Sequence, residues 1–574
     1  MTLLLAILPV LVLIVVMTSP WPRRVFPWPA QVALPVAAGL AYLIQWTPWF
    51  AGGDPARRVH AAVIEGLLSA LTPLGIVLGA IFFFRTMDRS GQLSVLTGAV
   101  RRLSPDPVAQ LLLIGWSFSF LIEGLSGFGT PAALAAPLLV GLGFPAVRVA
   151  AMCLVMNSVP VTFGAVGTPV WFGLSGLGLT DGEMATLRWQ AAVVNVAAAA
   201  VVPVVAMGLV VPLREVGRRW GYVAAVLAAT MLPYLLLALV SPEFPSIVGG
   251  ACGLAAGAAL AKVGWGLPKS ADAAGPPEEP DADKTSPDDE RVTAMAPLGP
   301  AGAAPGSVWR AAVPVLAVVA LLGVTRVDAL GLKGFLRSET PAVSVGLGAL
   351  GEAYLSASGV VGLRGILGTA TNWKMELLYV PFILPFVVMA VGAALWLRMP
   401  RRELAAAWRE TLQRLSKAAV ALLGALVLVK LLMSGGETSA VRVLGEGLAS
   451  GAGGAWPVVA PLLGALGAFF AGSATVSNLT FGGVQQSVAG VLGLPTPTVL
   501  ALQTVGASLG NMVCVHNIVA VAAVLGIGEK RGPAAGTPGE DGSVGGILRL
   551  TAGPALLYSA VAGAGGALLV WGPG

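Results

Sequence analysis

The chain has 574 residues, of which 56% are apolar and 11% are charged, and its mean hydropathy is +0.84. This composition excludes a soluble globular protein, because such proteins carry about 25% charged residues. The net charge of +6 is what basic loops on the cytoplasmic side of a membrane give, so nucleic-acid binding is not needed to explain it. We therefore expect a multi-pass protein of the cell (inner or cytoplasmic) membrane.

Apolar runs of roughly 20 residues, enough to cross about 30 Å of hydrocarbon, recur along the chain and predict about 12–14 transmembrane helices. The first run starts at Thr2 and ends in "PWPRR" without a basic n-region or a cleavage site, which indicates a retained helix. The three cysteines lie in apolar segments without C-x-x-C spacing. The sequence thus predicts an all-α fold with no metal site and no cofactor.

Two polar clusters interrupt the apolar runs of the first half. The first is "EGLSGFGT", residues 123–130, and the second is "MNSVPVTFGAVGTP", residues 156–169. Irregular backbone at membrane depth is tolerated only where it is buried in protein or lines a watery cavity. We therefore interpret both clusters as re-entrant tips or unwound helix centres, with close packing of small residues between helices as the alternative.

A polar stretch rich in proline and acids follows near the middle of the chain, at 268–306, and predicts a disordered linker. It divides the chain into an N-terminal membrane half (1–263), a linker (264–307) and a C-terminal membrane half (308–574). Further on, the segment from Arg401 predicts an amphipathic helix at the cytoplasmic surface. Its apolar face consists of Leu404, Trp408, Leu412 and Leu415.

The second half repeats the arrangement of the first. Its clusters are "AGSATVSNLTFGG", residues 471–483, and "QTVGASLGNMVCVHN", residues 503–517. In both halves a polar cluster, an apolar helix, a Gly-x-Pro, another helix and a second cluster follow one another. Transporters built from internal repeats place their broken helices at the bilayer midplane. The order therefore predicts two repeat-related halves whose broken helices or re-entrant hairpins converge near the middle of the membrane.

The clusters supply the candidate site residues. Free N–H groups at helix breaks and nearby hydroxyl and amide groups suit a small carboxylate. The candidates for substrate binding are Ser126, Gly127, Gly129, Thr130, Asn157, Ser158, Thr162, Ser473, Thr475, Ser477, Asn478 and Asn511.

The candidates for proton coupling are Glu123 and His516. An acid within a membrane span is by default a functional hypothesis. Glu123 either carries a symported proton or, when protonated, donates a hydrogen bond to substrate, and the alternative is a neutral acid that caps a broken helix. His516 could join a proton relay, with a buried, hydrogen-bonded histidine as the alternative.

Three motifs carry a family resemblance. "EGLSGFGTP", "NSVPVTFGAVGTP" and "GSATVSN" are similar to the E-G-x-x-G-F-G-x-P, N-[ST]-x-P-V-x-F-G-A-x-G-x-P and G-S-x-T-x-S-N stretches of the L-lactate permease family. The resemblance runs over nearly the whole chain. It implies uptake of L-lactate, and commonly glycolate or D-lactate, by proton symport across the bacterial inner membrane. The implied partners are the monocarboxylate, protons and the lipid bilayer, and a homo-oligomer stays open.

The chain departs from the family pattern at two places. Ala474 stands where members typically have an acid, and Asn511 stands where they have a lysine. Since one intramembrane charge alone would be costly, an interacting pair is expected to be lost together. A channel, or a transporter for a different small organic anion, therefore remains an alternative. An enzyme is not expected, because the sequence contains no H-E-x-x-H motif and its two histidines lie far apart.

Overall fold

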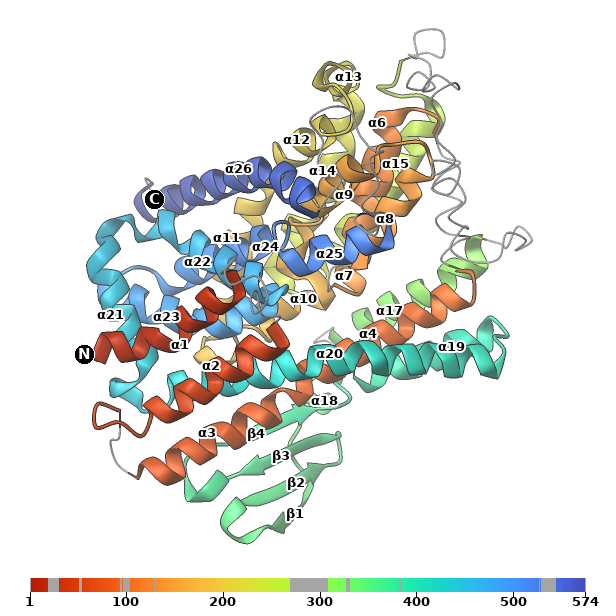
Figure 1. The fold of residues 1–574 in the computed structure, drawn as a ribbon. Helices are drawn as coiled ribbons and strands as arrows, with labels where there is room; N and C mark the ends of the chain where they lie inside the picture. Colours follow the sequence, from red (N-terminus) through yellow and green to blue (C-terminus); the bar gives the residue numbers. More distant parts are fainter. Residues whose placement is uncertain are drawn as a thin grey trace. The chain divides into compact units, whose positions relative to one another are not determined.

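The computed structural model describes residues 2–18, 30–50, 54–92, 95, 104–127, 130–268, 308–326, 331–380, 383–525, 527 and 544–572 (Figure 1). Helices dominate these residues. A backbone in lipid must satisfy its own N–H and C=O groups, and a helix does so within one segment. The composition and the secondary structure therefore agree.

Several of the described helices are suited to cross a membrane. Six are long and apolar enough, and a seventh span results if the helix pair at Ala146–Met156 and Pro160–Leu177, bent by 53°, counts as one. Six shorter apolar helices of 10–17 residues accompany them. On α14 (Trp220–Val240) the large side chains of Leu232, Leu236 and Val240 are exposed, as on a surface that faces lipid. The multi-pass helical fold class is confirmed.

The chain forms two compact units. Unit 1 comprises Met1–Leu96, Pro305–Gly453 and Gly482–Gly493, and unit 2 comprises Thr97–Ala304, Gly454–Phe481 and Leu494–Gly574. Each unit thus draws on residues from both sides of the predicted linker. Most of that linker, residues 269–307, lies outside the described residues. The division of the chain into 1–263, 264–307 and 308–574 stays a prediction.

Unit 1 is built around one long helix. Its helices are α1 (Thr2–Thr18), α2 (Ala30–Ile44), α3 (Pro55–Ser69), α4 (Leu71–Arg89), α17 (Val308–Arg326), α18 (Leu332–Leu336), α19 (Leu384–Trp396), α20 (Arg401–Met433) and α21 (Ala440–Ala452). The 33 residues of α20 run without a break and pack against α2, α3 and α4 (Figure 1).

Helix α20 begins at Arg401, where the predicted amphipathic helix begins. Trp408 and Leu412 are exposed, whereas Ala407 and Thr411 are buried. Charges hold this part of α20 to α4, since Arg89 Nη1 lies 2.7 Å from Glu403 Oε2 and Arg89 also pairs with Glu410. The predicted apolar face thus contacts α4 through Trp408, whose ring centre lies 4.9 Å from that of Phe82, while Leu412 is exposed.

The far end of α20 also carries an ion pair. Lys430, in the apolar part of the helix, pairs with Glu65 of α3. Both side chains are about one-fifth exposed, at 21% each. Each charge is costly in an apolar helix, and the partner offsets part of that cost.

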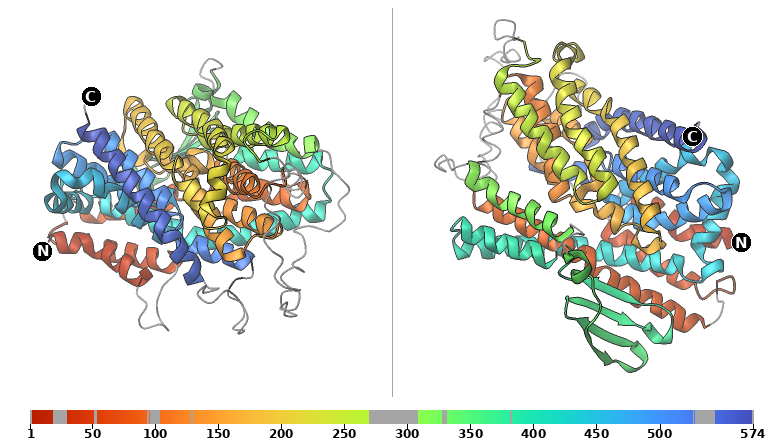
Figure 2. Two further views of the ribbon diagram at one scale, coloured as in Figure 1. Left: turned by 90° about the horizontal axis from the view of Figure 1, so that it is seen from above. Right: turned by 180° about the vertical axis from the view of Figure 1, so that it is seen from behind.

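A small antiparallel sheet interrupts unit 1 between α18 and α19, and the sequence analysis did not predict it. Its strands are β1 (Ala342–Gly346), β2 (Glu352–Ser356), β3 (Val360–Arg364) and β4 (Trp373–Glu376), and they lie side by side in chain order (Figure 2, right). In the register, Val343 pairs with Leu355, Leu355 with Val361, and Val361 with Met375. These apolar residues share one face because side chains alternate along a strand.

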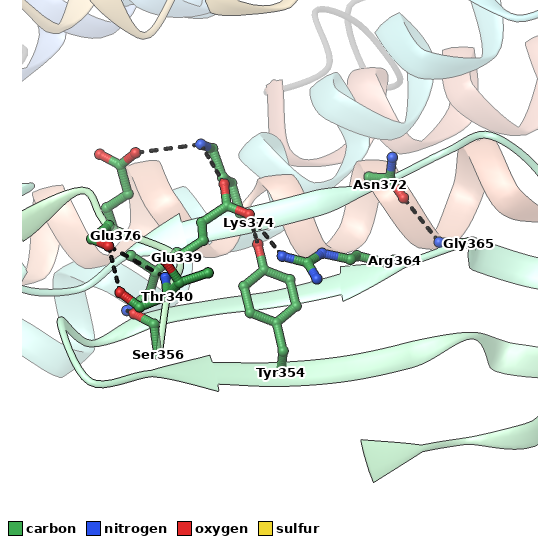
Figure 3. A network of polar contacts seen from close by, with 11 residues as sticks. Glu339, Thr340, Tyr354, Ser356, Arg364, Gly365, Asn372, Lys374 and Glu376 are labelled. Carbon is green, nitrogen blue, oxygen red and sulfur yellow. Dashed lines mark hydrogen bonds and ion pairs between the residues drawn. The ribbon is translucent and has the colours of Figure 1, made fainter. Parts of the chain in front are cut away.

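Charged residues gather on the opposite face of the sheet (Figure 3). The carboxylate of Glu339 accepts hydrogen bonds from Lys374 Nζ and Arg364 Nη2, both at 2.9 Å, and from Tyr354 at 3.2 Å. Lys374 also lies 3.7 Å from Glu376. The hydrogen bond from Lys374, followed by that from Arg364, lowers the pKa of Glu339 below its ordinary value of 4.5.

Unit 2 holds the broken helices. Its helices are α6 (Pro107–Gln110), η1 (Leu111–Phe118), α7 (Ser119–Leu125), α8 (Thr130–Val140), α9 (Ala146–Met156), η2 (Pro160–Phe163), α10 (Gly164–Trp171), η3 (Ser175–Leu177), α11 (Asp181–Ala199), α12 (Val202–Gly208), α13 (Leu213–Arg218), α14, α15 (Pro245–Val263), α22 (Trp456–Ala471), α24 (Thr496–Gly510), α25 (Val515–Val524) and α26 (Val544–Trp571). Helix α23 (Ala474–Leu492) begins in this unit and ends in unit 1. The π-helix η1 is buried throughout and leads directly into α7.

The two Gly-x-Pro sequences form turns of the same kind. After α8, Gly143 has a φ of +96° and Pro145 caps the start of α9. After α23, Gly493 has a φ of +65° and Pro495 caps the start of α24. Glycine ends a helix in the left-handed region without the strain that a side chain would bring. The local structure at these turns therefore agrees with the predicted repeat.

Candidate functional site

The ends of the broken helices in unit 2 border a cavity of about 20 Å³, which is room for about one water molecule. All four predicted polar clusters contribute to its wall. The lining residues are Glu123, Gly127, Val161, Gly164, Ala165, Thr168, Pro169, Gly472, Ser473, Ala474, Thr475 and Asn511. Clusters nearly 400 residues apart in the chain, counted from Glu123 to Asn511, thus meet at one place.

Glu123 lies in the last turn of α7 and is 3% exposed. The helix stops just after it, because Gly127 takes a left-handed φ of +59°. Asn157, which caps the end of α9, donates a hydrogen bond from Nδ2 to Glu123 Oε2 at 2.9 Å. The amide is a suitable partner for a carboxylate that has lost its water.

The other carboxylate oxygen of Glu123 lies beside the break between η2 and α10. A Cβ atom on Gly164 would come within 2.4 Å of Oε1, so any side chain at this position would displace the carboxyl group of Glu123. The next two residues, Ala165 and Val166, have φ values of +44° and +53°. A β-branched residue in the left-handed region is strained, and such strain persists only where the surroundings impose it. Glycine at position 164 therefore lets the backbone of this break lie close to the carboxyl group of Glu123.

The second half contributes two helix ends to the cavity. Ser473 precedes the first residue of α23, Ala474, and its Oγ accepts a hydrogen bond from Val476 N at 3.4 Å. Thr475 Oγ1 lies 3.4 Å from Thr168 Oγ1 of α10. At the other end, Asn511 caps the C-terminus of α24. The cavity is thus bordered by a helix N-terminus and a helix C-terminus.

Asn511 is held by a second asparagine. Asn517 Nδ2 donates to Asn511 Oδ1 at 2.6 Å and to its carbonyl oxygen at 3.1 Å. Both side chains are buried. This contact fixes the orientation of Asn511 at the cavity wall.

Ser477 and Asn478, which were predicted to bind substrate, lie outside the cavity lining. Ser477 Oγ donates to Gly464 O at 2.7 Å, and Asn478 Nδ2 donates to Pro169 O at 2.8 Å. Asn478 Nδ2 also lies 3.1 Å from Thr504 Oγ1. In this structure these groups join α23 to α10, α22 and α24.

Thr162 and Ser508 lie in a separate polar network. Their hydroxyl groups are 2.7 Å apart, and Asn195 Nδ2 donates to Thr162 Oγ1 at 2.8 Å and to Tyr234 OH at 2.7 Å. Tyr558 OH donates to Asn195 Oδ1 at 2.5 Å. The sequence analysis did not single out the last three residues. Polar side chains within the apolar runs of α11, α14 and α26 were the available signal.

The remaining candidates have local roles or lie outside the description. Ser126 Oγ donates to Ile122 O at 3.0 Å, and Ser158 Oγ donates to Val155 O at 2.6 Å. Gly129 lies outside the described residues, as do the side chains of Thr130 and His516. The site roles of all these candidates stay predictions.

The electrostatic character of the cavity follows from its lining. Among the twelve lining residues, Glu123 is the only one with an ionisable side chain, and none is basic. The helix N-terminus at Ala474 carries the positive end of a helix dipole. The wall therefore offers N–H and O–H groups and one carboxyl group, but no Lys or Arg.

Known proteins are similar to this chain over most of its length. The family model described as L-lactate permease matches residues 2–569. The "Putative L-lactate permease" of Haemophilus influenzae is 36% identical over 99% of this chain and 98% of its own length. The "L-lactate permease" of Bacillus subtilis is 26% identical over 83% of each chain.

Among solved structures, MtrF of Neisseria gonorrhoeae covers 98% of this chain and 97% of its own, with 14% identity and a TM-score of 0.45. This likeness is too low to support an argument about the fold. The match of the family model is not limited in this way, because it extends over almost every residue. The chain belongs to the L-lactate permease family of multi-pass membrane proteins, which in a bacterium lie in the inner membrane.

Proposed function

We propose that this protein takes up a small 2-hydroxy monocarboxylate, L-lactate in the first place, together with a proton. The observation that supports it most is the cavity where the four polar clusters meet, whose lining has one carboxyl group and no basic side chain. Relatives in Haemophilus influenzae and Bacillus subtilis carry the L-lactate permease name. D-lactate and glycolate share the carboxylate and the 2-hydroxyl group, so we expect them to compete.

The residues around the cavity suit such a substrate. The first-turn N–H groups of α23, at Ala474 and Thr475, would bind the carboxylate, as N–H groups at a helix N-terminus bind anions elsewhere. The hydroxyl of Thr168 and the amide of Asn511 would bind the 2-hydroxyl group. Glu123 would carry the proton.

The size of the cavity has a mechanistic consequence. A volume of about 20 Å³ holds about one water molecule, and a lactate ion is several times larger. The walls must therefore separate before substrate enters. We infer that the arrangement described here is a closed one and that the site opens alternately to the two membrane faces, as in other transporters with broken helices at the midplane.

A second candidate is a transporter or channel for a different small organic anion. Ala474 and Asn511 favour it, because both line the cavity at the positions where the family pattern has an acid and a lysine. Without that pair the polar contacts to the substrate differ, and so can its identity. A channel would use the same broken helices to line a pore.

Uptake into proteoliposomes tests these proposals. Labelled lactate, glycolate and acetate are offered with and without an imposed pH gradient, and empty liposomes and a protonophore serve as controls. We expect saturable lactate accumulation that depends on the pH gradient. Accumulation of acetate but not of lactate would support the different anion. If lactate never accumulates beyond the level that its own electrochemical gradient allows, the protein is a channel and symport is contradicted.

A further inference from the structure

The side chain of Asn157 is engaged with one partner. It is 1% exposed, and its Nδ2 donates to Glu123 Oε2 at 2.9 Å. Its Oδ1 is buried and has no hydrogen-bond partner among the described residues. A buried acceptor left without a partner is unfavourable and calls for an explanation. Within the part of the chain that the structure describes, the one polar contact that orients this amide is with the carboxyl group of Glu123.

We propose that Asn157 is a positioning residue which keeps the transported proton on Oε1 of Glu123, the oxygen that faces the cavity. This inference rests on the proposed function. The amide N–H that points at Oε2 needs an acceptor there, and the carbonyl oxygen of a protonated carboxyl group is a better acceptor than its hydroxyl oxygen. The proton therefore binds to Oε1, which lies beside Gly164 and Gly127, both of them lining residues.

An order of binding follows from this placement. An ionised Glu123 would repel a carboxylate in a cavity that has no basic side chain. With a proton on Oε1, the same group donates a hydrogen bond to the substrate anion. The proton therefore binds before the substrate.

The other titratable groups near α7 do not line the cavity. The elements packed against α7 are α8, α10, α14, α15, η1 and η2, and their titratable side chains are Cys252 and Lys262 of α15 and Tyr222 and Tyr234 of α14. The ring of Tyr234 packs on Phe120 of α7, and its hydroxyl accepts a hydrogen bond from Asn195. Gly124 of α7 meets Ile247 at the start of α15, so Lys262 lies fifteen residues further on, about 22 Å at 1.5 Å per residue.

Helix α9, which ends at Asn157, carries two more titratable groups. Arg148 lies nine residues before Asn157, about 13 Å along the helix. Cys153 lies one turn before it and is buried. Neither is among the residues that line the cavity. The proton of this site therefore has Glu123 as its acceptor.

The test compares the wild type with Asn157→Leu, which keeps the volume but removes the donor, and with the control Cys153→Ala in the same helix. Infrared titration of the full-length purified protein follows the protonated carboxyl band, which is assigned to Glu123 by its loss in Glu123→Gln. We expect Asn157→Leu to move the midpoint of the band upward by about one pH unit, because the ionised form loses a charge-assisted hydrogen bond. The alkaline limit of lactate uptake should move by the same amount.

Two results would overturn the inference: a midpoint that stays where the Cys153→Ala control has it, or lactate binding that persists above the midpoint. If Asn157→Leu does not fold, Asn157→Ser serves, because its shorter side chain cannot reach Oε2. A wild-type protein that fails to accumulate lactate would contradict the proposed function. The infrared midpoint would still decide the role of Asn157, so the two failures are distinguishable.

Discussion

A paired charge can be restored at the cavity wall by Ala474→Asp together with Asn511→Lys. The two residues are 2% and 5% exposed, so a new charge at either position is cut off from bulk water. Removing one partner of a buried pair costs about 3–5 kcal/mol. Each single mutant is in the same situation, because it carries one buried charge without a partner. We therefore expect Ala474→Asp alone and Asn511→Lys alone each to lower the free energy of unfolding by a large amount.

Helix ends reduce that loss. Position 474 is the first residue of α23, where an acid is favourable, and position 511 caps the C-terminus of α24, where a cation is favourable. Each effect is worth about 0.3–1 kcal/mol, which leaves a net loss of about 2–5 kcal/mol for each single mutant. Asn511→Lys also removes the side-chain acceptor of Asn517, at about 1 kcal/mol, and the second mutation does not restore it.

The assay is a double-mutant cycle on detergent-purified protein. Denaturant unfolding gives the free energies of the four chains, and lactate uptake gives the functional effect. We expect the double mutant to be more stable than the sum of the single losses by about 2 kcal/mol or more. Ala199→Asp combined with Asn511→Lys is the control, since Ala199 is buried but does not line the cavity. Losses that are additive within about 0.5 kcal/mol would refute the reasoning.

Three further predictions concern single groups. Glu123→Gln should abolish accumulation driven by a pH gradient but retain lactate counterflow, because exchange needs no net proton movement; unchanged accumulation would make Glu123 a structural cap. Gly164→Ala should lose lactate uptake at normal expression, because its Cβ would lie 2.4 Å from Glu123 Oε1, and full uptake would contradict this geometry. Hydrogen bonds from Lys374 and Arg364 lower the pKa of Glu339 from 4.5, so they stabilise the sheet above that pH. Amide exchange of residues 342–376 should accelerate as the pH falls through 4.5 and below, after correction for its intrinsic pH dependence, and Lys374→Met should reduce this effect.

The sequence predicted the helical membrane class and the segments that line the cavity. Composition and run length are sufficient for the first, because the lack of water in a bilayer leaves few alternatives. For the second, polar residues at membrane depth marked all four segments that the fold brings together. Asn511, which lines the cavity, and the contacting residues Glu123 and Asn157 all belong to these segments.

The individual partners could not be predicted. Thr162 meets Ser508, a contact over 346 residues of chain that no periodicity encodes, and it also accepts a hydrogen bond from Asn195. The sheet was missed although Val343 and Val345 alternate with small residues, since a short apolar alternation within a hydrophobic chain resembles a helix run. The contacts that hold α20 to α4, from Trp408 to Phe82 and from Glu403 to Arg89, could not be predicted either, because each joins residues far apart in the chain.

The turns at Gly143 and Gly493 have a consequence for how this protein could evolve. Each joins two helices through a left-handed glycine and a capping proline, and each stands at the same place in its half. If the two halves are a repeat, as the sequence predicts, the turns are the part that both copies keep and the polar ends are the part that diverges. Glu123 then stands in one copy where Ser473 stands in the other. Selection for a new substrate would then act on a few wall positions and leave the helix connections unchanged.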